Sequence, residues 1–201
     1  MSALPKTKLT PAEYLEIERK AEFRSEFYDG EMFAMAGTSP AHCDVKENLM
    51  WELRSRFGGS PCRARSSEQR VLVSPTGLYT YPDIVVMCKP PVYAFHDKDT
   101  LVNPTALIEV LSDSTEKYDR TTKLKMYQQI ESLQEYIMVA QDRPWCEQVA
   151  RQPDGSWVRN VFAELTGILV FASFPHRIPL SDIYAGVLFP EVPPPFSDER
   201  I

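Results

Sequence analysis

The sequence predicts a single α/β (α+β) domain in which helices pack against a mixed β-sheet. Segments with helical and strand-like patterns alternate along the chain, which is typical of such sheets. The chain has 201 residues, and 43% of them are hydrophobic, which is enough for a core of ordinary size. No repeat or linker divides the sequence, so we assign residues 1–190 to one domain and residues 191–201 to a proline-rich C-terminal tail.

Capping and turn residues place the elements of the first half. Thr10 followed by Pro11 is a favoured helix start, because threonine caps free N–H groups and proline suits the first turn. The Asp29-Gly30 pair predicts a tight hairpin turn, since glycine tolerates a positive φ. Together with the apolar periodicity, these signals predict helices over residues 11–16 and 40–57, hairpin strands over 23–28 and 31–35, strands over 62–66, 69–73 and 83–88, and a surface loop over 89–99.

The second half contains the most apolar strand and a long helix. Residues 105–111 form an apolar run, as is typical of a central strand. The polar turn that follows offers several caps for a helix over residues 116–132. The remaining signals predict strands over residues 135–141, 146–151 and 157–162.

Charge and hydropathy narrow the classes of partner. The chain has 22 Lys and Arg against 28 Asp and Glu, which gives a net charge of −6. Because DNA binding requires neutralised phosphates, it would need a local basic patch or metal ions. No apolar run approaches the roughly 20 residues that span a bilayer, and the N-terminus lacks the apolar core of a signal peptide. We therefore expect a cytoplasmic protein with no membrane partner.

The four cysteines carry little signal for a metal or redox site. Cys43, Cys62, Cys88 and Cys146 are widely spaced and contain no CxxC pair. Zinc sites and thioredoxin-like sites need tighter spacing. We therefore expect free, mostly buried thiols in a reducing compartment.

Two acidic residues stand in or beside apolar strands. Glu109 lies within ALIEVL, where a period of two puts Leu107, Glu109 and Leu111 on one face. A buried carboxylate needs a cation or strong donors, although an edge-strand glutamate facing water is the alternative. Asp83 opens another apolar strand and by itself would suit a turn. If the two strands pair, both carboxylates converge, and such hard oxygen ligands suit Mg²⁺ or Mn²⁺.

The helix expected after this strand carries a candidate lysine. Asp119, Lys123 and Tyr127 recur every four residues and so share one face. Lys123 could point back toward the carboxylates, where it would hold a water molecule or stabilise negative charge. The alternative is a solvated Asp119–Lys123 pair worth only about 0.3–0.5 kcal/mol.

The order of the polar motifs is more informative than each motif alone. The order is YDGE followed by Met35-Ala36-Gly37, then His42, YPDIVV, IEVLSDST, Asp119-Arg120 with Lys123 and Tyr127, and finally EYIMV. With this order and spacing, residues 11–139 resemble the Uma-type family of proposed restriction endonucleases. That family is a domain-of-unknown-function branch of the PD-(D/E)XK nuclease superfamily. The resemblance implies a restriction-endonuclease-like mixed central sheet flanked by helices, with an added β-hairpin region.

The resemblance also implies roles for the acidic residues. Asp83 takes the position of the superfamily's PD aspartate, and Glu109 takes the (D/E) position. Val110 takes the X position, whose backbone carbonyl could also face a metal ion. Glu26 resembles an additional acidic residue contributed before the core sheet. His42 also matches, but a lone histidine is more often structural than catalytic.

The superfamily lysine is the point of departure. It is expected at position 111, where this chain has Leu111. In the Uma-type family the lysine is often displaced onto the following helix, so the resemblance implies Lys123 in this role, with Lys125 as the fallback.

These inferences combine into one expected activity and two alternatives. We expect a DNA endonuclease that uses Mg²⁺ or Mn²⁺ to hydrolyse phosphodiester bonds, and a homodimer. The expected catalytic residues are Asp83, Glu109, Lys123 and Glu26, and the expected metal contacts are Asp83, Glu109 and Val110. The first alternative is an inactive nuclease-fold protein that acts as a binding or dimeric interaction module. The acidic net charge and the leucine at position 111 are the observations that favour it. Hydrolysis of another phosphate-containing substrate is the third option, although no Gly-rich phosphate loop is present.

Overall fold

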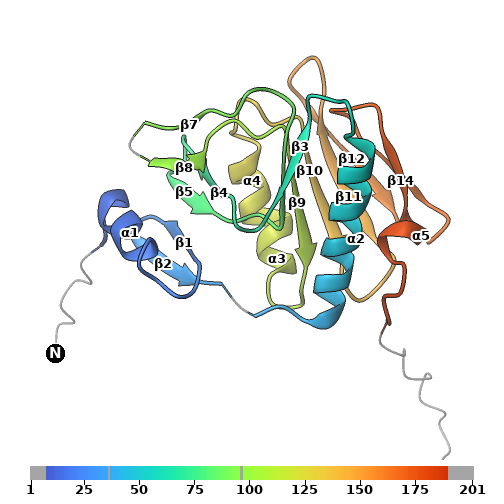
Figure 1. The fold of residues 1–201 in the computed structure, drawn as a ribbon, viewed down its shortest axis with the longest axis horizontal. Coiled ribbons are helices and arrows are strands. Elements are labelled where there is room, and N and C mark those ends of the chain that lie inside the picture. Colours follow the sequence, from blue (N-terminus) through green and yellow to red (C-terminus); the bar gives the residue numbers. More distant parts are fainter. Residues whose placement is uncertain (1–7, 36, 96, 190–201) are drawn as a thin grey trace, which may run out of the picture.

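In the part of the chain that the structure describes, two six-stranded β-sheets and one two-stranded sheet pack with helices, in agreement with the predicted mixed α/β (α+β) class (Figure 1). The computed structural model describes residues 8–35, 37–95 and 97–189. The expected proline-rich tail therefore lies outside the described residues. Across the described ranges, no helix has both the length and the apolar character needed to cross a lipid bilayer.

The main sheet contains the strands that carry the candidate site. β9 and β10 run parallel at its centre, and all their residues are buried. Every other neighbouring pair in this sheet is antiparallel. In order across the sheet, the strands are β12 (Trp157–Phe162), β11 (Cys146–Arg151), β10 (Glu135–Ala140), β9 (Ala106–Leu111), β6 (Ile84–Met87) and β3 (Arg63–Ser66). Each agrees within one residue with a strand predicted from the sequence.

The second sheet contains three strands that the sequence pattern did not reveal. Its strands, in order, are β2 (Glu31–Ala34), β1 (Ser25–Tyr28), β5 (Leu78–Thr80), β4 (Arg70–Val73), β8 (Asp97–Leu101) and β7 (Tyr93–Ala94). The surface loop expected over residues 89–99 was wrong, because it contains β7 and the start of β8. β8 begins with the polar residues DKDT, but its Asp97 is buried in a 2.6 Å ion pair with Arg70 of β4.

The helices begin where the capping residues predicted. The Thr10 side chain accepts the Glu13 N–H, and Ser39 caps the second helix in the same way. Figure 1 shows α1 with the β1–β2 hairpin at one end of the molecule and α5 with β14 at the other. The remaining elements are α1 (Pro11–Glu18), α2 (Pro40–Arg56), α3 (Glu116–Tyr118), the π-helix η1 (Asp119–Lys123), α4 (Leu124–Tyr127), β13 (Ile168–Val170), β14 (Arg177–Pro179) and α5 (Leu180–Ile183).

The helix expected over residues 116–132 is shorter than predicted. It runs without a break through α3, η1 and α4 and ends at Tyr127. Beyond that point the N–H groups of Gln129 and Ile130 donate to carbonyls three residues back, which tightens the turn and ends the helix.

Alternate residues of β9 face two different hydrophobic cores. Ile108 and Val110 belong to the core formed with α2 and α5. Leu107 and Leu111 belong to the core formed with α4 and the second sheet. Because side chains alternate along a strand, Glu109 lies on the face of Leu107 and Leu111.

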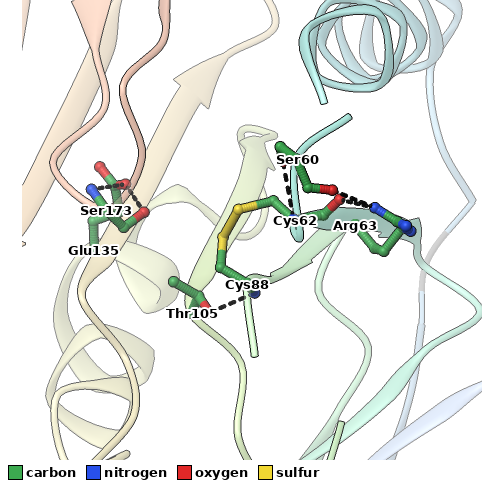
Figure 2. Close-up of a disulfide and its surroundings, with 7 residues drawn as sticks. All are labelled: Ser60, Cys62, Arg63, Cys88, Thr105, Glu135 and Ser173. Carbon is green, nitrogen blue, oxygen red and sulfur yellow. Dashed lines mark hydrogen bonds between the residues drawn. A yellow bond between two sulfur atoms is a disulfide. The ribbon is translucent and has the colours of Figure 1, made fainter. Parts of the chain in front are cut away.

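Two of the four cysteines form a disulfide, so the expectation of four free thiols was wrong. Cys62 and Cys88 are bonded (Figure 2), whereas Cys43 and Cys146 are free. The cause is strand register, because Arg63 of β3 pairs with Met87 of the antiparallel strand β6. Cys62 precedes Arg63 and Cys88 follows Met87, so the two cysteines lie opposite each other. Sequence spacing of 26 residues gave no hint of this long-range pairing.

The disulfide leads to a stability prediction. Replacing Cys62 with serine should lower the free energy of unfolding by about 2–4 kcal/mol, because the crosslink restricts the unfolded chain. Urea unfolding of the oxidised protein measures this change, with Cys43→Ser as the matched control for a free thiol. A Cys62→Ser variant as stable as the control would contradict the prediction.

Candidate active site

A cleft of about 450 Å³ lies where the main sheet meets the start of α2 and the π-helix. It is lined in part by residues that the sequence analysis singled out, namely Val110 and the polar residues Glu26, His42, Asp83, Glu109, Asp119 and Lys123. The acidic motifs come from separate strands, so their meeting depends on how those strands pair.

The pairing of β6 with β9 brings Asp83 and Glu109 together. Ile84 lies opposite Ile108 in this antiparallel pair, so the adjacent Asp83 and Glu109 are also opposite each other. The Asp83 N–H donates to Glu109 Oε2 at 3.2 Å. The Val110 N–H donates to Asp83 Oδ2 at 2.8 Å, which fixes the aspartate side chain. The two carboxylates thus converge at one edge of the cleft.

Lys123 reaches these carboxylates from the helix that follows β9. Its Nζ lies 2.9 Å from Glu109 Oε1, 3.0 Å from Glu26 Oε1 and 3.4 Å from Asp119 Oδ1. Only 8% of its side chain is exposed, so the alternative of a solvated Asp119–Lys123 pair was wrong. Tyr127, one turn later, donates its hydroxyl to Glu109 Oε1 at 2.8 Å. The shared helix face that the sequence predicted therefore meets the acidic strands.

The helix is locally widened where it carries Lys123. Residues Asp119–Lys123 form a π-helix, in which the Leu124 N–H donates to the Asp119 carbonyl five residues back. Single π-helical turns inside α-helices are frequent at functional sites. The spacing of apolar residues does not distinguish this turn from an ordinary α-helix, so the sequence analysis missed it.

The site contains more negative than positive charge. Glu26, Glu109 and Asp119 surround the ammonium of Lys123, and Asp83 lines the same cleft. Burial raises the pKa of Glu109 and the pKa of Asp119, and the lysine only partly offsets this effect. Burial acts against the charged lysine too, but the surrounding carboxylates outweigh it, so the pKa of Lys123 is raised well above its usual value. Several carboxyl groups therefore share one ammonium in this cleft.

The cleft offers oxygen ligands that a divalent metal ion could use. Among residues 8–35, 37–95 and 97–189, no group of three or more His, Cys, Asp and Glu side chains is arranged to hold a metal ion. The site instead offers two carboxylates, and Asp83 Oδ1 has no hydrogen-bond donor within the described part of the chain. Mg²⁺ is commonly held by one or two carboxylates, with water and phosphate oxygens as its other ligands. Asp83 and Glu109 fit that requirement.

His42 lies closer to the site than the sequence analysis suggested. Its Nε2 is 3.2 Å from Asp83 Oδ2, and its position is set by the start of α2, where the Ser39 side chain accepts the His42 N–H. Its buried Nδ1 has no hydrogen-bond partner among the described residues. Its place in the SPAHCDV segment gave no signal of this contact.

Leu111 and Lys125, the other two positions expected for the superfamily lysine, both lie outside the cleft. Leu111 is 2% exposed and packs in the core between the sheets, so it contributes nothing polar to the cleft. Lys125 is exposed on α4 and does not line the cleft. Of the two lysines proposed to replace the missing strand lysine, Lys123 is the one that meets Glu109.

Thr80 is a site neighbour that sequence reasoning missed. Its hydroxyl donates to Glu26 Oε1, and it lies 3.3 Å from the Tyr127 hydroxyl. β1 pairs with β5 in a register that puts Phe27 opposite Tyr79, so Glu26 and Thr80 are also opposite. Because β5 was not predicted, no sequence signal could have found this contact.

Comparisons with known sequences show which family the chain matches. The family model Uma2, described as "Putative restriction endonuclease", matches residues 11–180. The uncharacterized protein slr1290 of Synechocystis is 31% identical over 157 residues, which cover 77% of this chain and 80% of that protein. The uncharacterized protein sll1609 of the same organism is 32% identical over 150 residues, or 75% of this chain and 85% of that protein.

A solved structure shares the fold. It is a crystal structure described as a putative nuclease belonging to DUF820, from Anabaena variabilis. The TM-score is 0.71 at 19% sequence identity, and the match covers 88% of this chain and 98% of that chain. The predicted restriction-endonuclease-like architecture is thereby confirmed as a fold.

The buried ammonium leads to a second stability prediction. Lys123→Met should lower the free energy of unfolding by about 3–5 kcal/mol, because it leaves the carboxylates Glu109 and Glu26 buried without their cation. Lys125→Met, on the exposed side of the same helix, should change it by no more than about 0.5 kcal/mol. Urea unfolding of both variants checks the difference.

The loss of unfolding free energy in Lys123→Met should depend on pH. Without the ammonium, the pKa of Glu109 in the folded state rises further above its unfolded value, so the folded protein must either hold a proton or bury an unpaired charge as the pH rises. The destabilisation of Lys123→Met should therefore be larger near pH 8 than near pH 5. Equal stability of the two lysine variants at both pH values would contradict the prediction.

Proposed function

The chain belongs to the Uma2 family of restriction-endonuclease-like proteins, and from this premise we propose that it is a metal-dependent endonuclease that hydrolyses phosphodiester bonds of DNA. The family and the fold agree on a nuclease-type function. The observation that carries the finer proposal is the convergence of Asp83 and Glu109, with the Lys123 ammonium 2.9 Å from the glutamate.

In this proposal Asp83 and Glu109 hold Mg²⁺ or Mn²⁺, and the backbone carbonyl of Val110 is the third protein contact. Bound there, the ion would lower the pKa of a water molecule and offset charge on the phosphate. The protein's contribution is orientation. The Val110 N–H holds Asp83, and the Tyr127 hydroxyl holds Glu109.

Lys123 and Glu26 have different parts in the proposal. The ammonium of Lys123 donates to Glu109 and faces the cleft, where it would orient the attacking water and stabilise negative charge developing on the phosphate. Glu26 accepts from the same ammonium at 3.0 Å and so keeps the lysine charged and fixed in place. Glu26 is therefore a positioning residue rather than a metal ligand.

The departure at Leu111 does not require an inactive protein. An inactive nuclease fold was the alternative because leucine replaces the strand lysine. The position of Lys123 supports the active alternative, since a lysine from the next helix supplies the ammonium. DNA as the substrate and the homodimer remain predictions.

Plasmid nicking tests the proposed activity. The wild-type protein should nick supercoiled DNA in the presence of Mg²⁺ or Mn²⁺ but not with EDTA. Glu109→Gln should abolish nicking, because an amide cannot lose a proton to become the anionic oxygen ligand that the ion would need. Glu131→Gln, an exposed glutamate outside the cleft, is the matched control and should nick like the wild type. Nicking at the wild-type rate by Glu109→Gln, or no nicking by the wild type, would refute the activity.

Metal binding is tested separately by titration calorimetry. The wild-type protein should bind Mn²⁺ at the cleft, and Asp83→Asn should lose this binding, because the neutral amide is a weaker ligand for a hard cation. Asp44→Asn, an exposed aspartate on α2, is the control for removing one negative charge. Binding that survives in Asp83→Asn would move the metal site elsewhere.

A further inference from the structure

Exposed cations gather around the outer edge of the main sheet. Arg63 and Arg65 lie on β3, the edge strand, and Arg54, Lys89 and Lys98 lie beside it. Within the described residues, none of these five forms an ion pair, although many other Lys and Arg side chains do. We call this set the β3 basic patch.

The patch is a concave surface rather than a row of isolated side chains. Arg65 lines three adjoining cavities, and it shares two of them with Arg54 or Arg63. A fourth cavity lies between Arg54 and Arg63. Eight Lys and Arg side chains line the four cavities, against three acidic ones. Positive charge is thus concentrated here on a chain whose net charge is −6.

The acids near the patch do not neutralise it. Glu68 is already paired with Arg24 at 2.6 Å, and Glu18 is buried with a hydrogen bond from the Tyr81 hydroxyl. Asp99 is exposed and opposes part of the charge. Arg65 is oriented by neutral partners instead, since it donates to the Tyr93 hydroxyl at 3.0 Å. Its charge therefore remains available to a ligand.

The patch lies next to the proposed active site. β3 pairs with β6 so that Ser66 is opposite Ile84, the residue after Asp83. Arg65 therefore lies two residues along the strand from the position opposite Asp83. This spacing corresponds to about 7 Å along the strand direction and about 5 Å between the neighbouring strands. Alternation puts Arg65 on the sheet face that Asp83 also occupies, because Arg65 is opposite Val85. Tyr81 lines both the cleft and the cavity of the patch that Arg65 shares with Lys98.

We propose that the β3 basic patch binds the phosphate backbone of DNA beside the cleft, so that the strand is held at a second point near the bond to be cut. The inference rests on the proposed endonuclease function and adds a site for the flanking phosphates. Guanidinium groups bind phosphate oxygens through two parallel hydrogen bonds, and two of the patch's arginines lie on one rigid strand. Each strand of a duplex carries a phosphate per about 3.4 Å of axis, so neighbouring phosphates fall within the reach of this patch.

Binding in the absence of metal ions tests the patch independently of cleavage. Fluorescence anisotropy with a labelled duplex in EDTA should give salt-dependent binding by the wild-type protein. Arg63→Gln/Arg65→Gln should weaken binding about 10-fold or more at low salt, and should reduce the slope of log K against log salt by about 2, or roughly 0.9 per lost phosphate contact. Lys117→Gln/Lys125→Gln removes two exposed charges outside the patch and should bind like the wild type.

A second variant guards against a folding effect. Arg63 donates to the backbone carbonyls of Ser60 and Cys62, so its replacement can disturb the edge strand. Lys89→Gln/Lys98→Gln removes two patch charges that make no such bonds and should also weaken binding. Thermal unfolding checks that each variant is folded. Wild-type binding by both patch variants, or equal weakening in the control, would overturn the proposal.

Cleavage assays separate failure of the patch from failure of the proposed function. A small phosphodiester such as bis(p-nitrophenyl) phosphate cannot span both sites, so Arg63→Gln/Arg65→Gln should hydrolyse it at the wild-type rate while its KM for DNA rises. Metal-free DNA binding that depends on the patch, with no cleavage of any substrate, would reject the endonuclease and keep the patch. Cleavage of DNA with unchanged KM in the patch variants would reject the patch and keep the endonuclease.

Discussion

The register between β6 and β9 is the constraint on which the site depends. It sets Asp83 opposite Glu109, and two backbone N–H groups then hold the carboxylates in place. A shift of one residue would send Glu109 to the other face of the sheet, into the core formed with α2. Both strands are buried along their length, so hydrophobic packing specifies the register that the polar residues need. The core of the protein and its chemistry therefore share one structural cause.

Lys123 resolves the electrostatic problem that this register creates. Two carboxylates at the end of a buried strand pair repel each other and lose their hydration. The lysine bonds Glu109 directly, and Glu26 and Asp119 complete its surroundings. The group nevertheless remains negative overall. The protein's own ammonium thus holds these carboxylates together, and the metal ion of the proposed function would bind beside it.

The sequence predicted those parts of the site that have a local signature. Glu109 was found because it interrupts an apolar run, and Lys123 because it shares a helix face with Tyr127. Contacts that depend on long-range register had no such signature. Thr80 meets Glu26 only through β5, and Cys62 meets Cys88 only through the β3–β6 pairing. β8 was missed for a related reason, since its Asp97 reads as a loop residue until Arg70 of another strand pairs with it.

In the proposed function, Lys123 takes the part that the superfamily pattern assigns to a lysine at position 111. Leu111 fills the hydrophobic core between the sheets, where a lysine ammonium would need partners that this core lacks. Lys123 brings the same chemical group to Glu109 from the π-helical turn of the following helix, which packs against the same face of β9. What matters for stabilising a phosphate is the position of the ammonium relative to Glu109 and the cleft, not the strand or helix that supplies it. Position 111 of β9 is therefore free to hold an apolar side chain. The buried leucine there packs on the same face of β9 as Glu109.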